Sequence, residues 1–209
     1  MKVAVIPVTA YQQNSSLVWC PETEKGALID PGGDLEKLQK AVEEKGVIIE
    51  KILLTHAHID HAGGAADASS LFDAPIIGPH EGDNMLIEMM DMQSQMSGIP
   101  AKKFTPDQWL KDGDTVSVGN LQFDVLFCPG HTPGHLVFHA PKNNIAFVGD
   151  VLFQGSIGRT DLPGGDTQTL LNSIKTKLFP LNESTVVVSG HGPNTTIGNE
   201  KKSNPFLKG

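Results

Sequence analysis

Short runs of Val, Ile, Leu and Phe recur along the chain and are separated by Gly, Pro and polar turn residues. Short apolar runs bounded in this way are typical of β-strands. The pattern predicts strands at residues 2–8, 16–20, 27–30, 48–54, 74–77, 115–118, 121–127, 136–139, 145–148 and 185–189. The polar turn at 21–26 predicts that the second and third of these strands form a hairpin.

Four segments carry apolar residues at helical spacing instead, at residues 35–45, 62–72, 81–98 and 167–178. Asp34 is the expected N-cap of the first helix, and Gly46 ends it. The third segment has a methionine stripe at Met85, Met89, Met92 and Met96. Such a stripe predicts core packing, with a pliable cover over a ligand cleft as the alternative.

Alternation of strands with helices predicts an α/β fold. No Ser/Gly linker, charge block or low-complexity segment divides the sequence. We therefore expect a single domain over residues 1–209.

The net charge of −8 argues against nucleic acid and anionic membranes as partners, because both favour Lys and Arg. The only cysteines, Cys20 and Cys128, are too far apart in sequence to suggest a disulfide framework or a zinc knuckle. The first ten residues do not resemble a secretory signal. We therefore expect a cytoplasmic protein.

The segment His56-Ala57-His58-Ile59-Asp60-His61 directly follows the predicted strand at 48–54. In an extended segment, residues i and i+2 point the same way, so His56 and His58 can hold one metal ion together. Asp60 and His61 then turn the other way as a helix begins, toward a second metal ion. Imidazole is the commonest transition-metal ligand. The segment therefore predicts a metal site at the carboxyl end of this strand.

Three more candidate ligands follow other predicted strands: His131, Asp150 and His191. Taken singly, each has an ordinary structural interpretation, as a hydrogen-bonded loop residue or a helix N-cap. The first motif requires partners of this chemistry, so we interpret all three as ligands. We interpret His80 as a surface-loop residue and His139 as a strand residue. His135 is interpreted either as a turn residue or as a residue that lies behind the ligands.

Arg159 is the only arginine and lies in a Gly-rich loop after Asp150. It is interpreted either as the ion-pair partner of Asp161 or as a clamp for a substrate carboxylate. Tyr11, the only tyrosine, stands in a turn-like segment. It either lines the mouth of the cleft or packs as an ordinary aromatic residue.

Four motifs resemble those of the metallo-β-lactamase superfamily and occur in the same order. They are Thr-His-x-His-x-Asp-His at 55–61, Pro-Gly-His-Thr-Pro-Gly at 129–134, Gly-Asp at 149–150 and Ser-Gly-His-Gly-Pro at 189–193. The segments 29–33 and 204–207 look like the glyoxalase II branch. The resemblance implies a four-layer αβ/βα sandwich with its site in a shallow cleft along one edge. It implies two metal ions, one on His56, His58 and His131, the other on Asp60, His61 and His191, with Asp150 bridging them.

The glyoxalase II-like resemblance implies a dinuclear hydrolase of acyl thioesters, such as S-lactoylglutathione or a related glutathione conjugate. We expect two divalent ions, zinc in the first place, with iron and manganese as alternatives. A metal-bridging hydroxide would attack the thioester carbon, oriented by Asp60. Arg159 and Tyr11 are the expected substrate-binding residues.

Two departures from the family pattern qualify these expectations. Secreted β-lactamases generally have a Cys ligand where Asp150 stands, so antibiotic hydrolysis is not expected. Glyoxalase II enzymes hold glutathione with a C-terminal helical extension, and only 18 residues follow His191, so we expect that extension to be lacking. Three alternatives stay open: a mononuclear iron persulfide (sulfur) dioxygenase, suggested by Gly-Arg-Thr-Asp at 158–161, a lactonase, and a non-catalytic metal-binding module.

Overall fold

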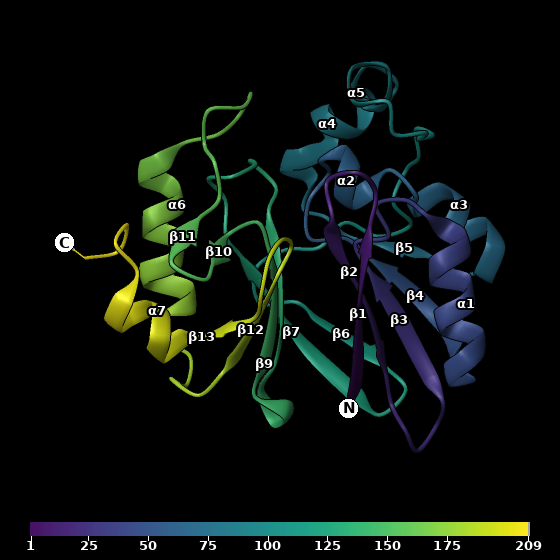
Figure 1. Cartoon of the computed structure of the whole chain (residues 1–209), viewed down its shortest axis with the longest axis horizontal. Coiled ribbons are helices and arrows are strands. Elements are labelled where there is room, and N and C mark those ends of the chain that lie inside the picture. Colours follow the sequence, from purple (N-terminus) through teal and green to yellow (C-terminus); the bar gives the residue numbers. More distant parts are fainter. Residues whose placement is uncertain (209) are drawn as a thin grey trace.

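Two mixed β-sheets face each other in the computed structural model, which describes residues 1–208, and helices cover the outer face of each sheet (Figure 1). The first sheet has the order β1 (Lys2–Val8), β2 (Gln13–Trp19), β3 (Lys25–Ile29), β4 (Ile48–Leu53), β5 (Ile76–Ile77). The second has the order β13 (Thr195–Thr196), β12 (Val186–Ser189), β9 (Ile145–Gly149), β8 (Leu136–Ala140), β7 (Leu121–Phe127), β6 (Thr115–Val118). A separate two-stranded ribbon consists of β10 (Leu152–Phe153) and β11 (Ser156–Ile157).

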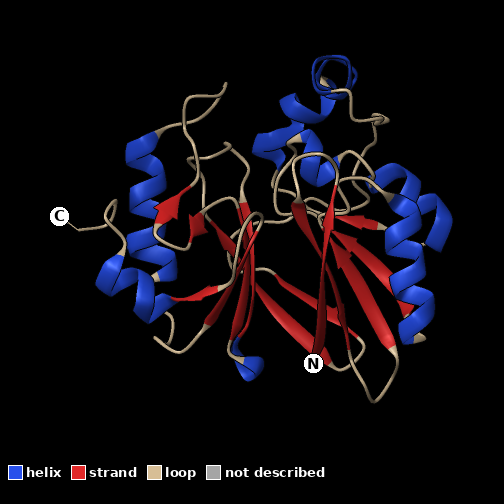
Figure 2. Cartoon of the chain, viewed as in Figure 1, coloured by secondary structure: helices blue, strands red, loops and turns tan. Residues whose placement is uncertain are grey.

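Three separate apolar cores define four layers. The first core packs α1 (Leu35–Lys45) and α3 (Ala65–Phe72) against the first sheet. The second fills the space between the sheets, and its largest side chains are Phe123, Phe138 and Phe147. The third packs α6 (Thr167–Ser173), its continuation to Leu178 and α7 (Ile197–Ser203) against the second sheet. Figure 2 shows the resulting order of helix, sheet, sheet and helix. The predicted αβ/βα sandwich is confirmed.

The predicted strands are all present, with ends within three residues of the observed ones. The predicted helix at 62–72 corresponds to α3, and Gly63 and Gly64 separate it from a short helix before it, α2 (Ile59–Ala62). The two-residue strands β10, β11 and β13 and the helix α7 were not predicted. Segments this short carry too few residues for a periodic signal.

The prediction that the methionine stripe packs into the core is wrong. Met85, Met92 and Met96 are 46%, 52% and 82% exposed. The predicted helix at 81–98 is a 3-10 turn (Glu81–Asp83) followed by α4 (Asn84–Glu88) and α5 (Met90–Ser97). The interruption at Met89 changes the helical phase, and Leu86, Ile87 and Met90 form the buried face instead.

Asp34 occupies the N-cap position of α1, but its side chain does not cap the helix. Its backbone is left-handed, with φ 48°, and its carboxylate accepts hydrogen bonds from the Thr9 backbone N–H at 3.2 Å and from Lys37 Nζ at 2.5 Å. The carboxylate therefore ties α1 to the turn after β1.

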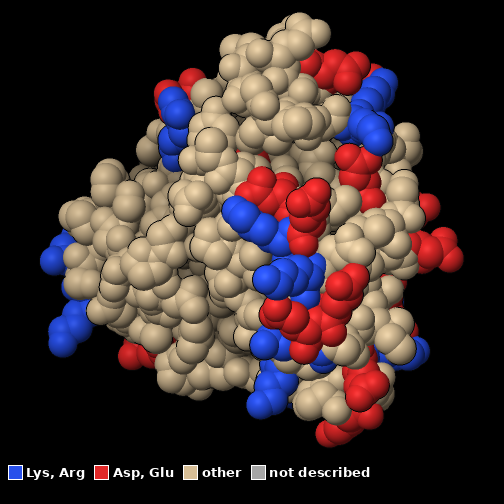
Figure 3. All heavy atoms as spheres, turned by 45° about the vertical axis from the view of Figure 1, so that its right-hand side comes forward, with Lys and Arg blue, Asp and Glu red and all other residues tan. Residues whose placement is uncertain are grey.

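On the face drawn in Figure 3, acidic and basic side chains lie next to one another, so neither sign forms a broad patch there. Within residues 1–208, no helix is long and apolar enough to cross a membrane.

Candidate metal centre

The segment 56–61 joins the first sheet to α2. The chain is still extended at His58, with φ −67° and ψ 147°, and α2 starts at the next residue. His56 and His61 are fully buried, while His58 and Asp60 are partly exposed. This is the strand-to-helix turn that the sequence predicts.

The second sheet supplies three side chains at the same edge. His131 lies between β7 and β8, Asp150 directly follows β9, and His191 follows β12. His58 Nδ1 lies 2.9 Å from His131 Nε2. His191 Nε2 lies 3.1 Å from Asp60 Oδ2.

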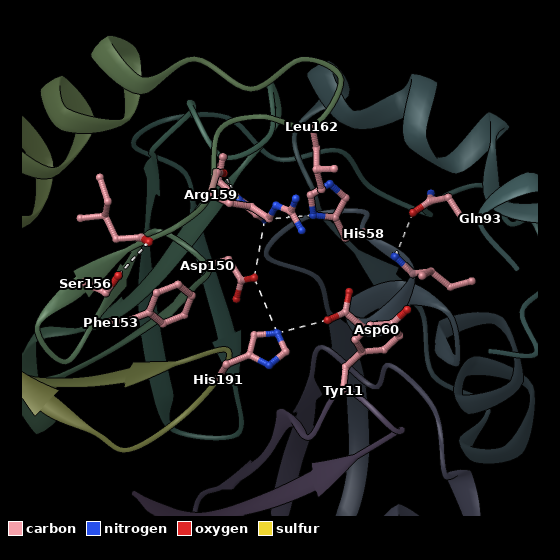
Figure 4. A pocket seen from close by; sticks show the side chains of 13 residues that line it. Tyr11, His58, Asp60, Gln93, Asp150, Phe153, Ser156, Arg159, Leu162 and His191 are labelled. Atoms are coloured by element: carbon pink, nitrogen blue, oxygen red, sulfur yellow. Dashed lines mark hydrogen bonds and ion pairs between the residues drawn. The ribbon is translucent and has the colours of Figure 1, made fainter. Parts of the chain in front are cut away.

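Asp150 lies between the two sets of histidines. Its Oδ1 is 3.3 Å from His61 Nε2, and its Oδ2 is 3.6 Å from His131 Nε2 and 3.7 Å from His191 Nε2. The structure thus brings together all seven side chains that the sequence singles out. Figure 4 shows Asp60, Asp150 and His191 pointing toward one another.

Three groups of side chains are each compact enough to hold one metal ion, because their nitrogen and oxygen atoms lie within 4.8 Å of one another. Two of them share no residue: His56, His58, His131 and Asp60, His61, His191. The third, Asp30, His56 and His61, takes one histidine from each of these and adds Asp30. His56 Nε2, His61 Nε2 and Asp150 Oδ1 are buried and make no hydrogen bond within residues 1–208. Buried polar atoms are normally satisfied, so atoms left free side by side fit a pair of cations. Mixed imidazole and carboxylate ligands suit zinc, iron or manganese.

The negative charge around the site also fits bound metal ions. Asp30, Asp60, Asp83 and Asp150 lie in or beside the cluster, and in the described part of the chain none of them contacts Lys or Arg. Burial alone raises the pKa of Asp150, but His61, followed by His131, brings it well below its usual range. Burial alone lowers the pKa of His61, but Asp150 and Asp60 raise it well above its usual value. Two divalent cations would balance the four carboxylates.

Hydrogen bonds behind the histidines select which ring nitrogen faces the centre. His61 Nδ1 donates to Asp30 Oδ2 at 2.9 Å, and His131 Nδ1 donates to the Arg159 carbonyl at 2.7 Å. His56 Nδ1 donates to Thr55 Oγ1 at 3.0 Å. In each ring Nε2 is then free to bind metal, the arrangement usual for metal-bound histidines.

Sequence reasoning assigned no role to Asp30. Its carboxylate also accepts from the Thr55 N–H at 2.7 Å and the Thr55 hydroxyl at 2.6 Å, which fixes the start of segment 56–61. The Ile-Asp-Pro-Gly-Gly segment at 29–33 was the available signal.

The three histidines interpreted as non-ligands occupy different places. His135 is buried behind the centre, where Nε2 accepts from the Asp150 N–H at 3.1 Å and the ring stacks on His56. His80 accepts from the Gly82 N–H, and His139 is a half-buried residue of β8. None of the three belongs to the two ligand groups.

A cleft of about 530 Å³ opens onto the centre. Its other walls include Ile157 and five residues labelled in Figure 4: Tyr11, Gln93, Phe153, Arg159 and Leu162. Arg159 Nε and Nη2 donate to the two carboxylate oxygens of Asp161 at 2.8 and 2.7 Å. The predicted ion pair is present, and the same arginine also lines the cleft. Tyr11 is 52% exposed at the cleft wall, so it is not packed in the core.

An αβ/βα sandwich with a histidine- and aspartate-lined cleft at the strand ends defines a class of metal-dependent enzymes, mostly hydrolases. The chain belongs to the metallo-beta-lactamase superfamily, which residues 8–191 match.

The chain is 47% identical over 209 residues to the hydroxyacylglutathione hydrolase GloC of Haemophilus influenzae, which covers 99% of this chain and 98% of the relative. Among solved structures it is similar to the B3 metallo-beta-lactamase BLEG-1, with TM-score 0.92, 38% identity and full coverage of both chains. It is also similar to TTHA1623 in a di-iron-bound form, with TM-score 0.89, 40% identity, 98% of this chain and 100% of the other. ETHE1 from Myxococcus xanthus is more distant, with TM-score 0.83, 26% identity, 98% of this chain and 84% of the other.

Proposed function

We propose that this protein hydrolyses acyl thioesters of the hydroxyacylglutathione type at a dinuclear metal centre. The observation that carries the proposal is the convergence of seven candidate ligand side chains, three of whose buried polar atoms make no hydrogen bond, at the base of an open cleft. The full-length similarity to a hydroxyacylglutathione hydrolase supports the choice of substrate.

We assign His56, His58 and His131 to one metal ion and Asp60, His61 and His191 to the other. The position of Asp150 between the two groups suits a ligand shared by both ions. Zinc is our proposed metal, and the di-iron-bound form of TTHA1623 makes iron the principal competitor. Elemental analysis of the purified protein separates the two.

The two cations would supply Lewis acidity, stabilising negative charge on an acyl oxygen and making water more acidic. Asp60 Oδ2 lies on the cleft wall, 3.1 Å from His191 Nε2, and would accept a hydrogen bond from the attacking water and so orient it. A thiol has a pKa of about 8.5, so the leaving group needs no proton from a side chain.

The cleft offers two kinds of contact to a thioester. Phe153, Ile157 and Leu162 form an apolar wall beside the centre. Arg159 is the only Lys or Arg that lines the cleft in the described residues, and we propose that it pairs with a glutathione carboxylate. Tyr11 would contact the same part of the substrate from the opposite wall.

The test is hydrolysis of S-lactoylglutathione by protein of known metal content, followed as loss of the thioester absorbance. Activity should require two equivalents of metal and should be lost in His131→Ala. His139→Ala is the matched control, because this histidine lies on β8 outside the ligand groups. A metal-replete protein that leaves S-lactoylglutathione intact would overturn the proposal.

Hydrolysis of β-lactams is a second candidate, which the similarity to BLEG-1 over the full chain favours although Asp150 stands where secreted β-lactamases generally have a Cys. The β-lactam ring is a cyclic amide, and its carbonyl carbon is electrophilic like that of a thioester. A chromogenic cephalosporin assayed with the same metal-loaded samples decides between them through the ratio of the two kcat/KM values.

A further inference from the structure

Asp83 is a buried carboxylate for which the proposed reaction has no use. It ends the 3-10 turn before α4 and is 0% exposed. Its Oδ2 accepts from the Ala57 backbone N–H at 2.9 Å and from Thr132 Oγ1 at 2.9 Å, and its Oδ1 accepts from the Gly134 N–H at 2.5 Å. No Lys, Arg or His pairs with it anywhere in residues 1–208. Burying an unpaired carboxylate is costly, and three hydrogen bonds only partly offset that cost.

The three donors come from the two loops that carry one complete ligand group. Ala57 stands between His56 and His58, and Thr132 directly follows His131. One loop extends from the first sheet and the other from the second, with no strand pairing between those sheets. The Leu136 N–H donates to the Thr55 carbonyl at 2.8 Å where the two loops start and end. Between the ligands themselves, the Asp83 carboxylate links the backbone of one loop to the side chain and backbone of the other.

The link requires the two backbones to approach closely. A Cβ atom on Gly134 would lie 2.4 Å from the Asp83 nitrogen and 2.6 Å from the His80 carbonyl oxygen. The His80 N–H also donates to the Gly134 carbonyl at 3.2 Å. Segment 80–83 thus packs on the His131 loop, and the Asp83 side chain also reaches the His56–His58 loop.

We propose that Asp83 is a positioning residue for the metal centre: it holds the His56–His58 loop and the His131 loop at the separation that lets all three histidines bind one ion. The inference rests on the proposed metal centre but not on the proposed substrate. It also gives the segment that leads into α4 and α5 a direct connection to the metal ligands.

The test compares Asp83→Asn with Glu200→Gln. Asparagine keeps the size of the side chain but turns one acceptor into a donor that faces N–H and O–H groups. Glu200 is an equally buried carboxylate in α7 that accepts from Thr195 Oγ1 at 2.6 Å and from Asn204 Nδ2 and the Gly155 N–H at 2.8 Å each. It belongs to neither ligand group, so it controls for the loss of a buried, hydrogen-bonded carboxylate.

Three quantities are measured without substrate: the unfolding temperature of each metal-free protein, its metal dissociation constants by competition with a chelator, and the visible absorption spectrum after loading with Co²⁺. Both variants should unfold at lower temperature than the unmodified protein. Only Asp83→Asn should bind metal about 10- to 100-fold more weakly and show an altered Co²⁺ spectrum. Equal affinity and spectrum in the two variants would overturn the positioning role.

Thr132→Val keeps the inference testable if Asp83→Asn does not fold, because it removes one of the three hydrogen bonds. Metal affinity should fall several-fold, and unchanged affinity would count against the proposal. The outcomes also separate the two proposals. Weaker metal binding in Asp83→Asn with no thioesterase activity in the unmodified protein would reject the substrate alone. An unmodified protein that binds no metal would reject both.

Discussion

Removing the metal ions should lower the unfolding temperature of this protein by about 12 °C, measured against protein in free metal at 100 times the dissociation constant. The reason lies in the origin of the ligands: four follow β4 in the first sheet and three follow strands of the second. Only the folded chain brings them together, so metal binds the native state in preference to the unfolded one.

The magnitude follows from the length of the chain. With 209 residues and an unfolding entropy of about 2.1 cal/mol/K per residue, the total is about 0.44 kcal/mol/K. Each site at 100 times its dissociation constant adds about 2.7 kcal/mol, so two sites add about 5.4 kcal/mol. Dividing this free energy by the entropy gives about 12 °C. Each further tenfold increase in free metal should raise the unfolding temperature by about 6 °C for two sites and about 3 °C for one.

Thermal melts over a buffered series of free metal concentrations therefore count the sites. Asp150→Asn serves as the control, because it keeps the side-chain volume while it removes the charge between the two groups. A slope near 3 °C per decade would refute the dinuclear assignment and favour a mononuclear centre. No dependence on metal would refute the convergence of the ligands itself.

Asp150→Ala should weaken metal binding by about 10²- to 10⁴-fold, the effect of about 3–5 kcal/mol expected when one partner of a buried ion pair is removed; dialysis and elemental analysis would show it, and full retention of both ions would contradict the shared role. Arg159→Gln should raise the KM for S-lactoylglutathione several-fold with little change in kcat, and Asp161→Asn should lower it by releasing the guanidinium; KM changes of the opposite sign would exclude a substrate clamp. Metal affinity should fall as pH is lowered. Burial lowers the pKa of His61, but the carboxylates of the site raise it by more than burial lowers it. The metal-free protein therefore holds a proton on His61 that the metal must displace. Titrations at several pH values test this, and affinity that rises toward acid pH would contradict it. Phe123→Ala, in the core between the sheets, should cost about 3–5 kcal/mol and lower the unfolding temperature by about 10 °C; a shift below about 2 °C in a thermal melt would show that this core relaxes around the cavity.

Much of the fold was predictable because its signals are local. Apolar runs locate the strands of both sheets, and Gly and Pro mark their ends. The segment 56–61 was predictable for the same reason: the spacing of His56 and His58 fixes their common direction once the backbone is extended. His131, Asp150 and His191 each follow another predicted strand, and this was enough to predict that they would lie close to segment 56–61.

The features that escaped prediction depend on contacts between distant parts of the chain. The burial of Met90 rather than Met92 depends on a break in helical phase at Met89, which no propensity at that position signals. Asp83 looks like a surface residue among polar neighbours, and only the closeness of two remote loops gives it a role. Long-range contacts of this kind leave no periodic trace in the sequence.

The neighbouring strands β9 and β12 bring two of the proposed metal ligands, Asp150 and His191, close together. They run parallel, and a glycine, Gly149 at the end of β9 or Gly190 directly after β12, immediately precedes Asp150 or His191. The register shifts after Val188, and the Gly190 N–H then donates to the Gly149 carbonyl at 2.7 Å. A Cβ atom on Gly190 would lie 2.2 Å from Asp150 Oδ1, so any larger residue there would displace the shared carboxylate. The glycine before His191 thus leaves the space that Asp150 occupies, so two proposed ligands from different strands come within 3.7 Å of each other.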